Sequence, residues 1–180
     1  MRRAFRRRMR RSFTPDIPPI LQRANVLLNK GEYAQAAQAF EELARAAELR
    51  GGPRAPLFFL QAGHARLLAG QKPAGFELLK HGLGLLAQRR VHIRLYLLGP
   101  RVAAELDQHG MAKEAAEMRE WLKGALPAGF SAPAPEAGKK PLLPTHCPAC
   151  GAPVRPDEVE WLDEATAECA FCGSPVREAD

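Results

Sequence analysis

Two matching cysteine turns near the C-terminus constrain the fold of this chain more than any other feature. The sequence reads C-P-A-C-G at residues 147–151 and C-A-F-C-G at residues 169–173, and these two turns hold all four cysteines of the chain. Two sulfurs three positions apart on a tight turn can reach one metal ion, and a second such turn completes a tetrahedron. The spacing therefore predicts one Zn²⁺ ion, ligated by Cys147, Cys150, Cys169 and Cys172.

The predicted zinc ion is structural rather than catalytic. Four thiolates close the coordination shell, whereas a catalytic zinc keeps one position open for water. Two disulfides in a secreted domain are the alternative, and the lack of a visible secretory signal disfavours them. Redox chemistry through one C-x-x-C pair would need a βαβ framework, and neither turn has such a framework around it.

The residues between and after the turns favour short strands. Acidic and apolar side chains alternate over residues 158–163, as in a half-buried strand, and 166–169 and 175–177 are candidates for two more. We expect Trp161 to cover the metal turns. A domain of about 35 residues buries too little apolar area to stand alone, so metal ligation is expected to supply much of its folding free energy.

From His146 to about Arg177 the chain resembles the zinc-ribbon family with rubredoxin-like knuckles. The resemblance implies a small β domain over residues 146–180 with the four cysteines as its ligands. It leaves the function open, because ribbons bind nucleic acid, bind proteins or brace a neighbouring domain.

Residues 18–126 show helical periodicity throughout, interrupted by glycine turns. Gly31, Gly70 and Gly110 are 39 and then 40 residues apart, and an amphipathic segment lies on each side of every one of them. A glycine that ends one helix in a left-handed cap and opens the way to the next is typical of a helical hairpin. The pattern predicts six helices, near residues 18–29, 33–50, 55–69, 73–88, 91–109 and 112–124. The fold class is therefore mainly α, with three helix-turn-helix hairpins in a short solenoid and a small β ribbon.

Over residues 18–124 the chain resembles the tetratricopeptide repeat family. Small, turn and large packing residues fall where that motif has them, at Ala24, Gly31, Tyr33, Ala36 and Phe40, at Phe59, Gly63, Gly70, Gly75 and Leu79, and at Ala103, Leu106, Gly110 and Ala115. The sequence departs from the family in its period, which exceeds 34 residues, in Arg119 at an apolar position, and in Gly99-Pro100, which interrupts the fifth helical segment. The resemblance implies a concave face that binds extended peptides or helices. By position, the candidates to line it are Asn25, Asn29, His64, Leu68 and Gln108.

An arginine-rich arm precedes the helices. Residues 1–17 are predicted to be disordered, and they carry seven arginines and no acidic residue before position 14. The arm is suited to an anionic partner, which could be RNA, DNA, a lipid surface or the ribbon itself, whose residues 146–180 hold eight acidic and two basic side chains. A solubilising tail and an organellar transit peptide are the alternatives. The arginines concerned are Arg2, Arg3, Arg6, Arg7, Arg8, Arg10 and Arg11.

Residues 127–145 form a linker with five prolines. A chain of partly polyproline character can extend far, so the ribbon is predicted to be tethered rather than obligatorily docked.

The sequence contains no recognised catalytic constellation. Its five histidines form no H-E-x-x-H pair, and nothing resembles a phosphate-binding glycine loop or a nucleophile elbow. No run of eighteen apolar residues is present to span a membrane. We therefore expect a cytoplasmic, non-catalytic adaptor that binds protein partners and no small-molecule substrate. The alternative is a nucleic-acid-associated protein anchored by the arginine arm, acting on RNA, DNA, the ribosome or the transcription machinery.

Overall fold

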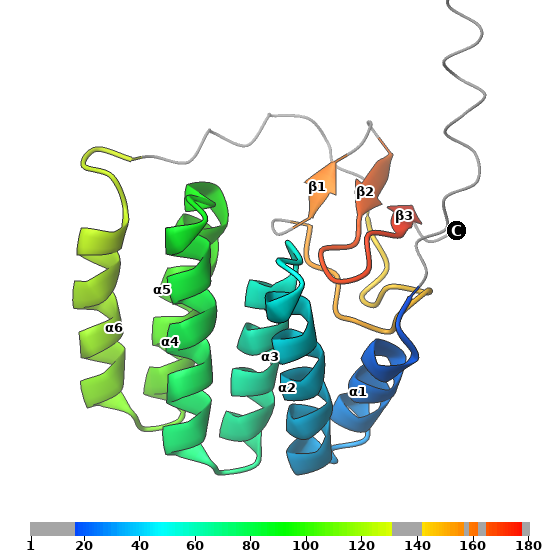
Figure 1. Ribbon diagram of the computed structural model, residues 1–180, viewed down its shortest axis with the longest axis horizontal. Coiled ribbons are helices and arrows are strands. Elements are labelled where there is room, and N and C mark those ends of the chain that lie inside the picture. Colours follow the sequence, from blue (N-terminus) through cyan, green and yellow to red (C-terminus); the bar gives the residue numbers. More distant parts are fainter. Residues whose placement is uncertain (1–16, 131–141, 157–158, 162–164, 178–180) are drawn as a thin grey trace, which may run out of the picture.

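Six helices stand side by side in chain order and carry a small sheet at one end (Figure 1). The computed structural model describes residues 17–130, 142–156, 159–161 and 165–177. Each helix contacts the next along the chain, so the helices form three successive hairpins. The predicted fold class, mainly α with helical hairpins and a small β unit, is confirmed. None of the helices in these described ranges is long and apolar enough to cross a membrane.

The element bounds agree with the sequence pattern to within one residue at the end of each helix. The helices are α1 (Pro19–Asn29), α2 (Tyr33–Leu49), α3 (Ala55–Leu68), α4 (Lys72–Gln88), α5 (His92–Gln108) and α6 (Ala112–Ala125). The strands are β1 (Glu160–Trp161), β2 (Thr166–Glu168) and β3 (Pro175–Arg177), which form an antiparallel sheet in the order β1-β2-β3. Ala167 of β2 lies opposite Trp161 on one side and Val176 on the other.

All five turns between helices end in the same left-handed cap. The cap residues are Gly31, Gly51, Gly70 and Gly110, with φ between 66° and 78°, and Arg90, with φ of 57°. After each one, the next residue donates its N–H to a carbonyl five positions back, at 2.7 to 2.9 Å. This is the Schellman arrangement, which satisfies carbonyls at the end of a helix. The sequence pattern predicted the glycine caps within the three hairpins, and it singled out neither Gly51 nor Arg90, which lie between hairpins. A non-glycine residue in this conformation carries no sequence signal.

Small residues set the spacing between α3 and α4. A Cβ on Gly63 would lie 3.0 Å from the Gly75 carbonyl oxygen, and a Cβ on Gly75 would lie 3.0 Å from that of Gly63. The two backbones approach this closely because neither residue has a side chain. Gly82 of α4 serves the same purpose against the Pro56 carbonyl of α3, whereas Gly84 has open space at the Cβ position. The helical core that results is built largely of alanine, leucine and phenylalanine.

Helix α5 corrects one expectation from sequence. Gly99-Pro100 was predicted to interrupt the fifth segment, but α5 runs without a break from His92 to Gln108. Proline removes one N–H donor, which leaves the Tyr96 carbonyl without its usual partner four residues on. Tyr96 is 39% exposed, so water can reach that position on the helix. Gly99 is buried, and a Cβ there would collide with Leu122 of α6. Glycine at this position therefore lets α5 pack closely against α6.

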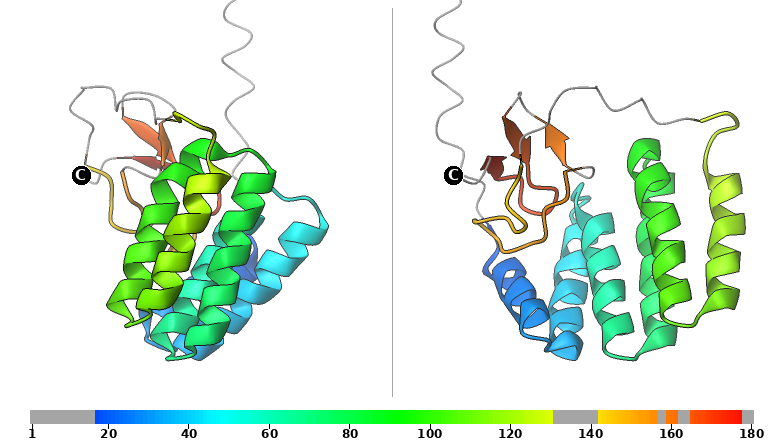
Figure 2. Two further views of the ribbon diagram at one scale, coloured as in Figure 1. Left: turned by 90° about the vertical axis from the view of Figure 1, so that its left-hand side faces the viewer. Right: turned by 180° about the vertical axis from the view of Figure 1, so that it is seen from behind.

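The C-terminal unit lies near the ends of α1 and α3 rather than apart from the helices (Figures 1 and 2). We call its described residues, 142–156, 159–161 and 165–177, the cysteine module. Figure 2 shows the same arrangement in two further views, with the module beside the helical array in each.

The glycine crossing predicts a paired effect on stability. Gly63→Ala would put a methyl group 2.6 Å from the Leu79 Cγ, so we expect it to destabilise the chain by about 1–3 kcal/mol. Gly84→Ala meets no atom within 4 Å and should stabilise α4 by up to about 1 kcal/mol. Thermal unfolding followed by circular dichroism checks both. Equal effects of the two changes would contradict the close crossing.

Candidate metal centre

Each cysteine turn is closed by its own backbone hydrogen bonds. Gly151 donates its N–H to the Cys147 carbonyl at 2.8 Å, and Gly173 donates to the Cys169 carbonyl at 2.8 Å. Both glycines have positive φ, 76° and 78°, which lets the chain reverse directly after the second cysteine. The two turns therefore have the same local structure, as their matching sequences predict.

A second pair of bonds fixes where each turn begins. Cys147 donates its N–H to the Ala152 carbonyl at 2.8 Å, and Cys169 donates to the Ser174 carbonyl at 2.9 Å. The Ser174 N–H in turn points to the Cys172 Sγ at 3.5 Å. Strands β2 and β3 flank the second turn on its two sides and bring it opposite the first.

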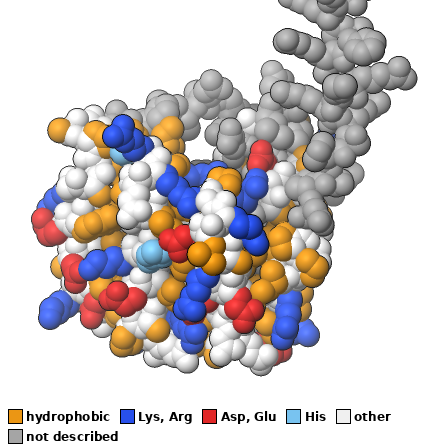
Figure 3. Space-filling model, viewed as in Figure 1, with side chains coloured by type: hydrophobic (Ala, Val, Ile, Leu, Met, Phe, Trp, Pro, Cys, Tyr) orange, Lys and Arg blue, Asp and Glu red, His pale blue; other side chains and the backbone are white. Residues whose placement is uncertain are grey.

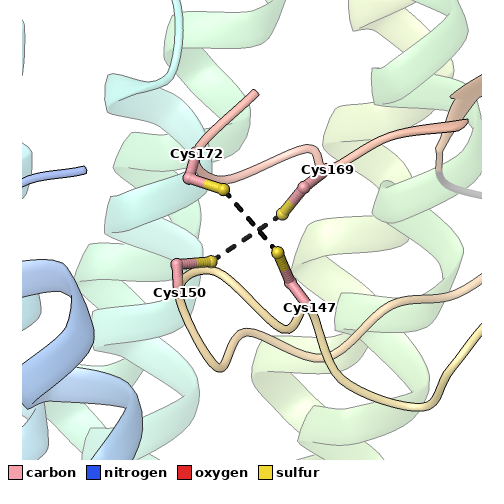
Figure 4. A group of neighbouring side chains, drawn as sticks. All are labelled: Cys147, Cys150, Cys169 and Cys172. Carbon is pink, nitrogen blue, oxygen red and sulfur yellow. Dashed lines mark hydrogen bonds between the residues drawn. The ribbon is translucent and has the colours of Figure 1, made fainter. Parts of the chain in front are cut away.

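The four cysteine sulfurs converge on one point (Figure 4). Cys147 and Cys172 have their sulfurs 3.7 Å apart, Cys150 and Cys169 have theirs 3.9 Å apart, and all four sulfurs lie within 4.8 Å of one another. A tetrahedral zinc with Zn–S bonds of about 2.3 Å would separate its sulfurs by about 3.8 Å. The four cysteines are free thiols and at most 6% exposed. They are consistent with one metal ion such as zinc.

The electrostatics of the sulfurs favour a cation at their centre. The hydrogen bond with Cys150 lowers the pKa of Cys147 to about 6, and the hydrogen bond with Cys147 lowers the pKa of Cys172. The same contacts raise the pKa of the Cys150 and Cys169 thiols, with Cys147 as the main cause in each. Without a cation, Cys150 and Cys169 are therefore the thiols that keep their protons. A divalent ion would replace those protons, so metal affinity should fall as the pH falls.

Two other residues near the turns lie outside the sulfur cluster. His146 is exposed, and its ring contacts the Thr145 hydroxyl at 3.1 Å, so it is not grouped with the four sulfurs. Trp161 directs its ring N–H to the Pro156 carbonyl at 3.4 Å, and its expected role as a cover for the metal turns stays a prediction. Phe171, between the ligands of the second turn, is only 7% exposed, and sequence reasoning did not single it out.

Helix α1 holds the first cysteine turn. The Asn25 side chain is 1% exposed and donates its amide N–H to the Cys150 carbonyl at 2.8 Å. One turn earlier in the helix, the Gln22 amide donates to the Ala149 carbonyl at 3.0 Å. A Cβ on Gly151 would lie 3.5 Å from the Asn25 Cβ, so the turn and the helix are in close contact. Asn25, a predicted residue of the partner groove, is thus engaged by the chain's own metal turn.

The turn between α2 and α3 holds the second cysteine turn. Arg54 pairs with Glu168 of β2 at 2.7 Å, and its guanidinium lies directly against Gly173. Both side chains are about one-third exposed, so the pair contributes orientation more than stability. With both turns in contact with helices, the module is docked in this structure, a point that the predicted tether left open. The prolines of a linker indicate how stiff it is, but they do not predict whether the domain that follows it contacts the helices.

The remaining groove candidates divide into two groups. His64 of α3 pairs with Glu105 of α5, so it bridges the second and third hairpins. The other three candidates are the last residues of α1, α3 and α5, next to the glycine turns, namely Asn29, Leu68 and Gln108. They do not line the cavity described in the next paragraph. Residues 1–16 lie outside the described part of the chain, so the role of the seven arginines stays a prediction.

A cavity of about 150 Å³ lies where the helices meet the cysteine module. Its walls are mostly apolar, with leucines from α1, α3, α4 and α5 and, from the module, Pro153, Ala170 and Phe171. The polar residues that line it are Gln61, His64, Arg94, Arg101, Glu105 and Arg155. Burial, and then the neighbouring Arg155, lowers the pKa of Arg101. Figure 3 shows basic side chains gathered along the middle of one face of the molecule.

Metal substitution tests the ligand set. With Co²⁺ in place of the native ion, we expect one ion per chain and the absorption of a tetrahedral four-thiolate site, because four sulfurs close the shell. Cys172→Ser should lose that spectrum, whereas His146→Ala should keep it. A spectrum altered by His146→Ala would show a mixed cysteine and histidine site.

The contact between Asn25 and Cys150 predicts a second effect. Asn25→Ala removes the donor to a buried carbonyl and should cost about 1–3 kcal/mol and speed the release of metal to a chelator. Asn29→Ala, one turn further along α1 and exposed, is the matched control and should change neither quantity. Release rates that are equal in the two variants would mean that α1 does not support the metal turn.

Comparison with known proteins adds no family. No family model matches the sequence, and neither a curated protein nor a solved structure is significantly similar to it. The assignment of the site therefore rests on its own geometry. That geometry gives a six-helix body with paired helices and a C-terminal cluster of four cysteines suited to one metal ion.

Proposed function

We propose that this chain is a non-catalytic adaptor that binds a protein partner between its helical hairpins and its cysteine module. The cavity of about 150 Å³ between these two parts carries the proposal, because both parts contribute to its walls. Arrays of helical hairpins commonly present such surfaces to peptides.

The metal in this proposal is one structural Zn²⁺ ion held by Cys147, Cys150, Cys169 and Cys172. Four sulfurs leave no position for a reacting water, so the ion braces the fold. A reducing compartment such as the cytoplasm suits a site that needs four free thiols. The helices belong to this picture as a short tetratricopeptide-like platform, and the module as a zinc ribbon docked on it.

The lining of the cavity supports binding rather than catalysis. Its titratable residues are one paired histidine and glutamate, His64 and Glu105, and three arginines. Among the described residues that line it, none offers a hydroxyl or thiol nucleophile. A histidine and carboxylate pair without a nucleophile lacks the third member of an acyl-transfer site.

Affinity capture from native extract tests the adaptor. The zinc-loaded full-length chain should recover the same protein partners after nuclease treatment and after deletion of residues 2–13, which removes the arginine arm. Cys172→Ser should lose those partners, because it unravels one wall of the cavity. Partners that disappear with nuclease or with the arm would instead assign the function to the arginines and to nucleic acid.

A further inference from the structure

The cavity has features that narrow the chemistry of its occupant. Its volume, about 150 Å³, is comparable to that of an apolar protein cavity that takes up a single benzene ring. It therefore has room for one bulky apolar side chain and not for a whole helix. Leu60, Leu98 and Val102 are among the residues that would surround such a side chain.

The charges of the residues that line the cavity indicate which residues should flank the inserted apolar side chain in the partner. Three guanidinium groups, from Arg94, Arg101 and Arg155, line the cavity together with one carboxylate, Glu105, which is already paired with His64. Arg101 and Arg155 also make contacts within the chain. The preference for an acidic partner therefore comes from the excess of positive charge in the lining and not from an unpaired arginine. Arginine binds carboxylates through two parallel hydrogen bonds. A basic segment would be repelled.

One wall of the cavity belongs to the metal centre. Ala170 and Phe171 stand between the two ligands of the second turn, Cys169 and Cys172, and both line the cavity. When the ion holds these cysteines, the two residues between them are fixed in place. Loss of the ion would remove that wall, so binding in the cavity depends on the metal.

We propose that the partner is a peptide segment that inserts one bulky apolar side chain between α3, α5 and the second cysteine turn and places neighbouring carboxylates on the three arginines. This inference rests on the proposed adaptor function and specifies the partner for the same site. Electrostatic attraction of this kind weakens as added salt screens the charges.

The experiment is a selection from a random peptide library displayed on phage, against the zinc-loaded full-length chain. We expect the enriched peptides to share one large apolar residue flanked by aspartate or glutamate. Enrichment of basic or purely apolar peptides, or no enrichment, would overturn the inference.

Two variants then test where an enriched peptide binds, by fluorescence polarisation. Ala170→Phe fills the cavity from a half-buried position between the ligands and should abolish binding, with the Co²⁺ spectrum as evidence that the metal site is intact. Arg94→Glu should weaken binding about tenfold or more. Arg23→Glu makes the same charge change on the exposed surface of α1 and should have little effect. Unchanged binding to Ala170→Phe and Arg94→Glu would overturn the inference.

The experiments distinguish a failure of the inference about the peptide from a failure of the adaptor proposal. If native partners survive nuclease treatment but bind Ala170→Phe as well as the unaltered chain, the chain is still an adaptor, but its partner does not bind in the cavity between the hairpins and the module. If no native protein partner is recovered, the adaptor proposal fails even where a selected peptide binds.

Discussion

Four buried sulfurs that must share one site determine how the cysteine module is built. Its three strands hold two or three residues each, and its buried apolar side chains are few, among them Ala152, Val154, Ala167 and Val176. So small a unit buries too little apolar surface to offset the entropy of ordering the chain. Structural zinc supplies about 10–16 kcal/mol in zinc-finger peptides, which is far more than these contacts provide. A bound metal ion would therefore decide whether the module is folded.

The contacts between the module and the helices extend this dependence across the molecule. Asn25 reaches the backbone of a metal ligand, and Arg54 lies against the glycine that follows another. A contact that forms only in the metal-held module must, by linkage, also favour metal binding. With a metal ion bound, helix α1 and the turn before α3 would gain order from it, and the ion would gain affinity from the helices. The two parts would then be stabilised together, although a proline-rich linker joins them in sequence.

The parts of the fold that sequence predicted are those fixed by local rules. Helix bounds follow from periodicity and glycine caps, and the metal ligands follow from two matched turns, each with its cysteines three positions apart. The docking of the module could not be predicted in this way, since Asn25 and Cys150 are 125 positions apart and neither carries a signal for the other. Gly82 and Gly84 make the same point within one helix, because only the neighbouring helix reveals that the first is packed tightly and the second is not.

The hollow between helices and module is itself a departure from close packing. Protein interiors pack as densely as organic crystals, and apolar surface left open to water forgoes roughly 25 cal/mol per Å² of burial free energy. The pocket is partly open, so several of the leucines that line it, among them Leu28, Leu97 and Leu98, are incompletely buried. At Gly63 and Gly75, in contrast, the backbones of α3 and α4 lie in close contact. An apolar side chain from a partner would pack against the walls of the cavity. The burial of that apolar surface would favour binding.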